Sequence, residues 1–225
     1  MTTMLSSARS RAGSRSGGVR GPLAAGAEVR LVLPAYRTGE RPKGERVPAL
    51  AVLGRSNVGK SSLLNTLLGT KVARVSQTPG RTQALFWYRV GEKFDVVDCP
   101  GYGYAKNSRS AREIFSTLIE ELVTGHVGGT SLSAALLLVD GRLEPQDSDL
   151  SMALFLRESL VPTVVAATKW DTVKPSERVR RRRALAAAYE ASDRPLLPVS
   201  SETGEHLPEL ARLLRAALPS PSPKE

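Results

Sequence analysis

The chain has 225 residues, enough for one full hydrophobic core, and nothing in the sequence suggests a second. It is basic, with 32 Lys and Arg against 22 Asp and Glu, a balance that favours a polyanionic partner such as RNA without requiring one. One cysteine and two histidines exclude an internal disulfide and a Cys/His zinc set. No apolar run approaches the about 20 residues that span a bilayer, so we expect a soluble, cytoplasmic protein that does not bind membranes.

The amino-terminal segment differs in composition from the rest. Its first 27 residues contain no acid, four Arg and five Ser, which cannot bury a core. We therefore predict a disordered basic arm over residues 1–28, a folded domain over residues 29–218 and a disordered Pro/Ser tail over residues 219–225. Arg- and Ser-rich, acid-poor ends also resemble organelle transit peptides, so cleavage of the arm stays an alternative.

A glycine-rich segment follows the apolar run of residues 49–53. It fits G-x-x-x-x-G-K-S/T with Gly54, Arg55, Ser56, Asn57, Val58, Gly59, Lys60 and Ser61. In such a phosphate loop the backbone N–H groups cradle phosphates, the lysine reaches the β- and γ-phosphates, and the serine hydroxyl meets Mg²⁺. Residues 62–68 have helical apolar spacing, so the phosphates would lie at a helix N-terminus.

Beyond this loop, strand and helix patterns alternate, as in doubly wound α/β domains. Residues 83–90 and 94–97 predict an antiparallel pair, and buried strands are predicted at residues 133–139, 162–167 and 196–199. Residues 29–33 would add an edge strand.

Helices are predicted at four places after the phosphate loop. The first begins with a capping box at Ser110 and stops at Gly125. The second begins at Asp147 and carries Leu150, Leu154 and Leu160 on its apolar side. The others run from Pro175 through Tyr189 and over Leu207, Leu210 and Leu214.

Two segments have the chemistry to meet a γ-phosphate and its metal. Asp98 ends a strand and is followed by Cys99, Pro100 and Gly101; the carboxylate can hold Mg²⁺ through water, and the Gly101 N–H can donate to the γ-phosphate. The turn-prone residues 78–83 contain Gly80, Arg81, Thr82 and Gln83. Thr82 could complete the Mg²⁺ shell, although a plain surface turn is the alternative.

Two further segments suit a guanine base. The base segment, Thr168, Lys169, Trp170 and Asp171, offers a carboxylate that can accept from both N1–H and the N2 amine of guanine, and a lysine stem that can cover the ring. Val199, Ser200 and Ser201 follow the last strand, where a backbone N–H can donate to guanine O6.

With these five sets the sequence resembles the EngB family of ribosome-biogenesis GTP-binding proteins, of the TrmE/Era type, over residues 47–218. The resemblance implies an α/β P-loop NTPase domain of the Ras-like type, with a mostly parallel six-stranded sheet and helices on both faces. It further implies GTP and Mg²⁺ binding, slow GTP hydrolysis, and a role in large ribosomal subunit assembly with a link to cell division and septation. We expect Lys60, Thr82 and Gly101 to be catalytic and Ser61, Thr82 and Asp98 to hold the metal.

One catalytic part is missing from the sequence. Small GTPases orient the attacking water with a glutamine directly after the Asp-x-x-Gly motif, and that position here is Tyr102. We expect its replacement by alanine to cost little activity. Arg81, Asn57 with a bound monovalent cation such as K⁺, or the partner would then supply the missing stabilisation.

For the partner we expect the large ribosomal subunit, bound by a monomer through residues 78–83 and 102–108. Arg81, Lys106 and Arg109 put positive charge there. A signalling module in which GTP only controls protein docking is the alternative class. The run of four arginines at residues 180–183 fits a solvated helix as well as a phosphate-binding patch.

Overall fold

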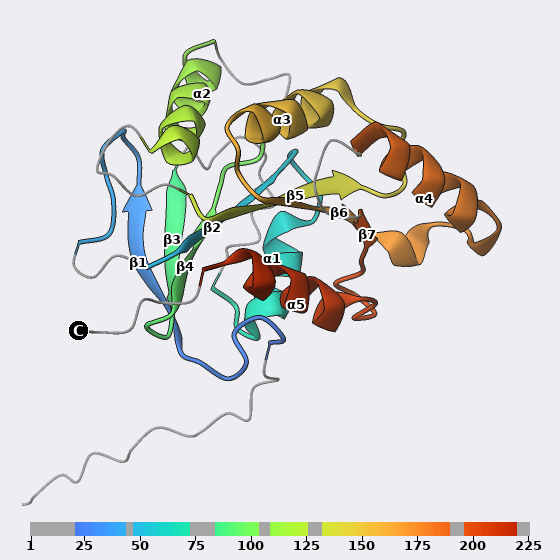
Figure 1. The fold of residues 1–225 in the computed structure, drawn as a ribbon, viewed down its shortest axis with the longest axis horizontal. Helices are drawn as coiled ribbons and strands as arrows, with labels where there is room; N and C mark the ends of the chain where they lie inside the picture. Colours follow the sequence, from blue (N-terminus) through green and yellow to red (C-terminus); the bar gives the residue numbers. More distant parts are fainter. Residues whose placement is uncertain are drawn as a thin grey trace, which may run out of the picture.

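The computed structural model describes residues 21–43, 47–72, 84–103, 109–125, 132–189 and 196–219. These residues form a sheet of order β1-β3-β4-β2-β5-β6-β7 (Figure 1). The strands are β1 (Val29–Ala35), β2 (Ala49–Gly54), β3 (Leu85–Val90), β4 (Phe94–Asp98), β5 (Ala134–Asp140), β6 (Thr163–Thr168) and β7 (Leu197–Pro198). The helices are α1 (Lys60–Leu68), α2 (Arg109–Thr124), α3 (Asp147–Glu158), α4 (Pro175–Tyr189), α5 (Leu207–Ala217) and the 3-10 turn η1 (Trp170–Thr172).

The sheet contains the six predicted strands and the added edge strand. β1, β3 and β4 pair antiparallel, whereas β4, β2, β5, β6 and β7 pair parallel. All six residues of β2 and of β6 are buried, as expected for parallel strands covered on both faces. The predicted fold class is therefore confirmed, with one more strand at the edge.

Alternate residues of the central strands face two separate cores. Leu50 and Val52 of β2 belong to the core that α1 and α5 cover, while Ala51 and Leu53 belong to the core under α2, α3 and α4. Figure 1 shows the two groups of helices on opposite faces of the sheet. None of the helices in the described ranges has the length and apolarity that crossing a membrane requires.

Helix α2 agrees with its prediction and helix α3 does not. In α2, Leu118, Ile119 and Leu122 are buried and the helix stops before Gly125, whose φ of 67° is left-handed. In α3 the fully buried residues are Asp149 and Leu156. Of the three predicted residues, Leu150 packs partly buried against the core, whereas Leu154 is exposed and Leu160 lies beyond the helix end. The predicted apolar face of α3 is thus correct only at Leu150, and it missed Asp149 because an apolar pattern does not mark a buried carboxylate.

The amino-terminal boundary also needs correction. Residues 21–27, predicted to belong to the disordered arm, pack against the domain: Leu23 is only 2 % exposed, and its N–H donates to the Leu67 carbonyl of α1 at 2.9 Å. A Cβ on Gly21 would lie 2.1 Å from the Gly69 nitrogen, so only glycine fits there. The arm prediction thus remains open only for residues 1–20, which lie outside the described part of the chain.

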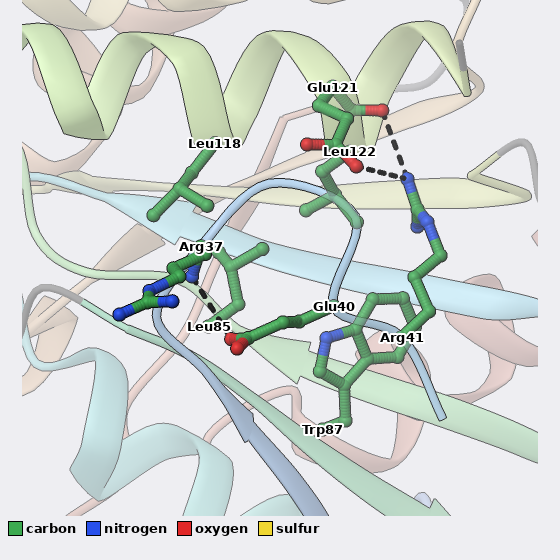
Figure 2. Close-up of a pocket in the computed structure, with 8 residues that line it drawn as sticks. All are labelled: Arg37, Glu40, Arg41, Leu85, Trp87, Leu118, Glu121 and Leu122. Atoms are coloured by element: carbon green, nitrogen blue, oxygen red, sulfur yellow. Dashed lines mark hydrogen bonds and ion pairs between the residues drawn. The ribbon is translucent and has the colours of Figure 1, made fainter. Parts of the chain in front are cut away.

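The loop after β1 joins the edge of the sheet to α2 (Figure 2). Gly39 N–H donates to Glu121 Oε1 at 2.7 Å, and the Arg41 guanidinium donates to the Glu121 carbonyl at 3.1 Å. The same guanidinium lies 5.7 Å from the centre of the Trp87 ring, a cation–π distance, and burial lowers the pKa of Arg41. The pocket lined by Arg41, Trp87, Glu121 and their neighbours contains none of the predicted nucleotide-binding residues. We therefore assign these contacts a structural role, in which they hold the loop after β1 against α2.

The packing of residue 23 gives a test of the corrected boundary. Leu23→Ala should lower the free energy of unfolding by about 2–5 kcal/mol, because a fully buried leucine is removed. Leu31→Ala is the control, since Leu31 is 51 % exposed on the edge strand, and it should change that free energy by less than about 0.5 kcal/mol. Urea unfolding measures both. Equal effects of the two changes would mean that residues 21–27 do not pack on α1.

Candidate functional site

The phosphate loop, the turn after β4, the base segment and the turn after β7 meet at one edge of the sheet. All four follow the carboxyl ends of strands, which is where open α/β sheets bind ligands. Because β2 lies between β4 and β5, its carboxyl end is central to this edge. The phosphate loop therefore has the other three segments around it.

Two residues of the phosphate loop have left-handed backbone conformations. Asn57 and Gly59 have left-handed φ angles of 64° and 99°, which carry the chain from β2 into α1. The first N–H bonded within the helix is that of Leu63, which donates to Gly59 O at 2.9 Å. The N–H groups at the start of a helix have no intrahelical acceptor, and with the helix dipole they form an anion site.

Lys60 and Asp98 bring opposite charges to this anion site. Lys60 Nζ lies 2.6 Å from Asp98 Oδ1, and the two side chains are only 12 % and 10 % exposed. Lys60 begins α1, and Asp98 ends β4. The geometry thus brings together the lysine predicted to meet phosphates and the carboxylate predicted to hold the metal.

The oxygen donors here suit Mg²⁺. The Ser61 hydroxyl follows Lys60 on the first turn of α1, and Asp98 supplies a carboxylate. Within the described residues no group of three or more His, Cys, Asp and Glu could hold a metal alone. Mg²⁺ is commonly held by one or two protein oxygens together with substrate phosphates, and Ser61 and Asp98 can supply such oxygens.

Gly101 lies directly against the phosphate loop. Ser56 Oγ donates to Gly101 O at 3.2 Å, and a Cβ on Gly101 would lie 2.9 Å from Ser56 Cα. A side chain at position 101 would therefore collide with backbone. The approach leaves the Gly101 backbone as the part that can meet a ligand of the loop.

The base segment is tied to the phosphate loop by two side chains. Lys169 Nζ donates to Asn57 O at 2.6 Å, and Thr168 Oγ1 donates to Val58 O at 2.6 Å. Trp170 N–H donates to Val199 O at 3.2 Å, which connects the segment to the turn after β7. Asp171 follows in η1 and is partly exposed, as a carboxylate that meets a base must be.

The turn after β7 is held by Ser200. Its side chain is fully buried, and its Oγ accepts from the N–H groups of Glu202 and Thr203, each at 3.1 Å. Ser201 follows at the partly exposed surface, and its backbone N–H can donate to guanine O6. The two groups predicted to read guanine, Asp171 and this turn, thus belong to connected segments.

Sequence reasoning missed Asp140, the last residue of β5. Its Oδ2 accepts from Lys169 Nζ at 2.9 Å, and its carboxylate also accepts from the Arg142 guanidinium. Burial alone would raise the pKa of Asp140, but the hydrogen bonds from Arg142 and Lys169 outweigh burial and hold it at about 2. An aspartate at the tip of a buried strand, the pattern used for Asp98, could have identified it.

Several predicted binding residues turn their side chains elsewhere. Arg55 Nη1 donates to Gln146 Oε1 at 2.9 Å, beside α3. Cys99 is buried in the core under α2, α3 and α4, where burial raises the pKa of its thiol, and Trp170 packs beside Gly141. The side chains of Cys99 and Trp170 are buried, so only the backbone of these two residues can meet a nucleotide.

Gly80, Arg81, Thr82 and Gln83 lie outside the described residues, so the structure does not test the roles expected of them. The predicted start of α2 at a Ser110 cap is one residue off, because α2 begins at Arg109 and Ser110 lies within the helix. The Ser110 side chain is not among those described.

Tyr102 points into the core. Its side chain is 8 % exposed, and its hydroxyl donates to Asp149 Oδ1 of α3 at 2.8 Å. A hydroxyl held in this way does not act as the glutamine of small GTPases does. The structure does not test the expectation that Tyr102→Ala costs little activity. The change should lower stability, because it would open a cavity and leave a buried carboxylate unpaired.

Three features together define a P-loop GTPase. They are a phosphate loop at a helix N-terminus, the Lys60–Asp98 pair beside it, and a base segment whose side chains donate to that loop. The family model described as "50S ribosome-binding GTPase" matches residues 49–169. A probable GTP-binding protein EngB of Thermotoga maritima is 42 % identical over 197 residues, covering 85 % of this chain and 96 % of that protein. The EngB of Anoxybacillus flavithermus is 39 % identical over 179 residues, covering 79 % and 91 %. The chain belongs to the EngB family of GTP-binding proteins.

Solved structures agree with this assignment. A crystal structure of a probable GTP-binding protein engB has a TM-score of 0.61 at 25 % identity, covering 75 % of this chain and 97 % of that chain. A structure of Era in complex with MgGDPNP and nucleotides 1506–1542 of 16S ribosomal RNA has a TM-score of 0.60 at 25 % identity, covering 81 % of this chain and 60 % of that one.

The position of Asp171 predicts guanine specificity. The wild-type protein should prefer GTP to ATP by about 10⁴ or more, because a site built for N1–H and N2 leaves buried polar groups unmatched by adenine. Asp171→Asn should weaken GTP binding and relatively favour xanthosine triphosphate, whose C2 carbonyl can accept from the amide.

Titration calorimetry with the three nucleotides measures this preference. Asp147→Asn, an exposed change of the same kind on α3, is the control and should bind GTP as the wild type does. Equal affinity of the wild type for ATP and GTP would remove the assignment of Asp171.

Proposed function

We propose that this protein is a Mg²⁺-dependent, slowly hydrolysing GTPase that acts as a switch in assembly of the large ribosomal subunit, and that normal cell division and septation depend on it. The observation that best supports GTP hydrolysis is that Lys60, Asp98 and Gly101 lie together at the phosphate loop. Membership of the EngB family and the family description as 50S ribosome-binding GTPases support the assembly role.

In the proposed reaction this chain positions groups and stabilises charge. Lys60 neutralises charge on the β- and γ-phosphates, and the Gly101 N–H donates to the γ-phosphate; such electrostatic terms carry phosphoryl transfer. Ser61 and Thr82 would ligate Mg²⁺, and Asp98 would hold it through water. The metal, when bound, neutralises charge that develops on the phosphate oxygens.

The reaction is expected to be slow in the isolated protein. With the Tyr102 hydroxyl engaged by Asp149, no side chain directly after Gly101 orients the water. The rate should fall near the intrinsic small-GTPase scale of about 10⁻⁴ to 10⁻² s⁻¹. Arg81, Asn57 with a bound K⁺, or the ribosomal partner are the candidates for the missing stabilisation.

The ribosomal partner is supported by charge as well as by family. The net charge of +10 suits a polyanionic surface. The Era structure contains ribosomal RNA, which makes RNA a reasonable contact for a relative. We propose contacts at Arg81, Lys106 and Arg109, since a γ-phosphate and Mg²⁺ would order the segments around them. Arg81, Lys106 and the Arg109 side chain lie outside the described part of the structure. The protein would act as a monomer in the cytoplasm.

Binding to large ribosomal subunits should depend on the γ-phosphate and on salt. Co-sedimentation should show tight association with a non-hydrolysable GTP analogue and weak association with GDP. Affinity should fall steeply with salt. Arg81→Ala should reduce the slope of log affinity against log salt concentration by about one unit for each RNA phosphate that Arg81 neutralises in the wild type.

Two control variants follow from the structure. Arg183→Ala changes an exposed arginine on α4 that is not one of the proposed contacts, and should leave the slope unchanged. A deletion of residues 1–20 tests the arm without removing Leu23 from the core, and should only make the salt dependence shallower. If the GDP and GTP-analogue forms bound large subunits equally, the switch would be refuted. If only the deletion of residues 1–20 abolished binding, the arm would be the docking element.

A further inference from the structure

The backbone after β4 is paired with the phosphate loop beyond the end of the regular strand. Tyr102 and Arg55 form an isolated parallel bridge, in which Ser56 N–H donates to Tyr102 O at 2.9 Å and Tyr102 N–H donates to Gly54 O at 3.4 Å. Gly101 lies between this bridge and the end of β4. Its place against Ser56 is therefore set by where Tyr102 is held.

The Tyr102 side chain is held by two helices. Its ring lies 6.2 Å from that of Phe115 on α2, and its hydroxyl donates to Asp149 on α3. Asp149 is only 2 % exposed and lies in the first turn of α3, 47 residues along the chain. Tyr102 thus connects the phosphate loop to α2 and α3, two of the helices that cover one face of the sheet.

The energetics of a buried carboxylate make this connection a strong one. Burial raises the pKa of Asp149 to about 6, against the effects of the Tyr102 hydrogen bond and the Arg55 charge, so the group is mostly ionised at neutral pH. A hydrogen bond to an ionised acceptor is about twice as strong as a neutral one. Breaking it would leave the carboxylate unpaired in the core, which is far more costly than losing an exposed hydrogen bond.

Packing alone does not account for this pair. A phenylalanine and a leucine would fill similar space, and replacing a buried polar or ionic pair with apolar groups is often neutral for stability. What apolar groups cannot do is fix one position of the chain, because a hydrogen bond has direction. The feature whose position depends most directly on Tyr102 is Gly101.

We propose that the Tyr102–Asp149 hydrogen bond sets the position of Gly101 against the phosphate loop, so that Asp149 is a positioning residue for recognition of the terminal phosphate of GTP. The inference deepens the proposed GTPase function and rests on it. GDP lacks the phosphate that the Gly101 N–H would meet, so the effect is confined to the triphosphate. Asp149 acts through Tyr102 and does not touch the nucleotide.

The test compares affinities for a non-hydrolysable GTP analogue and for GDP in the full chain. Tyr102→Phe keeps the ring and removes the donor; it should weaken the analogue about tenfold and change GDP binding by less than about twofold. Asp149→Ala should do the same, and the double variant should be no worse than either single change, because the residues act as a unit. Asp149→Asn keeps an acceptor for the hydroxyl and should stay close to the wild type.

A matched control separates positioning from loss of stability. Leu156→Ala removes a fully buried side chain from the same helix and leaves both members of the Tyr102–Asp149 hydrogen bond in place. It should lower the melting temperature and leave the ratio of analogue to GDP affinity unchanged. The proposal is overturned if Leu156→Ala shifts the ratio as Tyr102→Phe does, or if Tyr102→Phe leaves the ratio unchanged.

These affinities are measured without ribosomes, so the two proposals fail separately. A shifted ratio in Tyr102→Phe supports the positioning role even if subunits do not bind the wild type. An unshifted ratio overturns it even if binding to subunits depends on the γ-phosphate. Since Tyr102→Phe retains the ring packing, it decides the question should Asp149→Ala not fold.

Discussion

The ion pair between Lys60 and Asp98 is the interaction on which the rest of the site depends. Two largely buried charges at the end of a sheet are costly to desolvate, and stability alone is weak reason for such a pair. Ligand binding is a better reason, because a lysine and a carboxylate placed together at a helix N-terminus match a phosphate and its metal. The pair can form only if the first residue of α1 lies beside the last residue of β4 in space.

The order of the strands provides that condition. β2 leads into the phosphate loop and pairs in parallel with β4 on one side and β5 on the other, so the turns that follow these strands emerge at one edge. Side chains of β5 and of the base segment then connect this edge to the loop: Asp140 accepts from Lys169, and Lys169 and Thr168 donate to loop carbonyls. The base site and the phosphate site are thus one connected structure.

Much of this could be predicted from the sequence because its signals are local. The phosphate loop, the buried parallel strands and the strand-end Asp98 each lie in a short stretch whose spacing has one physical meaning. Asp149 was not predicted, because an aspartate at a helix start normally caps the helix or faces water, and its partner is far along the chain. Leu23 was missed for a similar reason: its surroundings have the composition of a disordered arm, and only its contact with α1 reveals it as core.

The central claim is that the charge of Lys60 holds the phosphates of a guanine nucleotide, and calorimetric titration of Lys60→Ala with GDP and Mg²⁺ tests it most directly. Lys60→Ala should bind GDP at least about thirtyfold more weakly than the wild type, since one member of a buried charge pair is removed and Asp98 is left to repel the phosphates. Lys93→Ala, an exposed lysine in the β3–β4 turn, should bind GDP as the wild type does. Equal affinity of Lys60→Ala and the wild type would contradict the account.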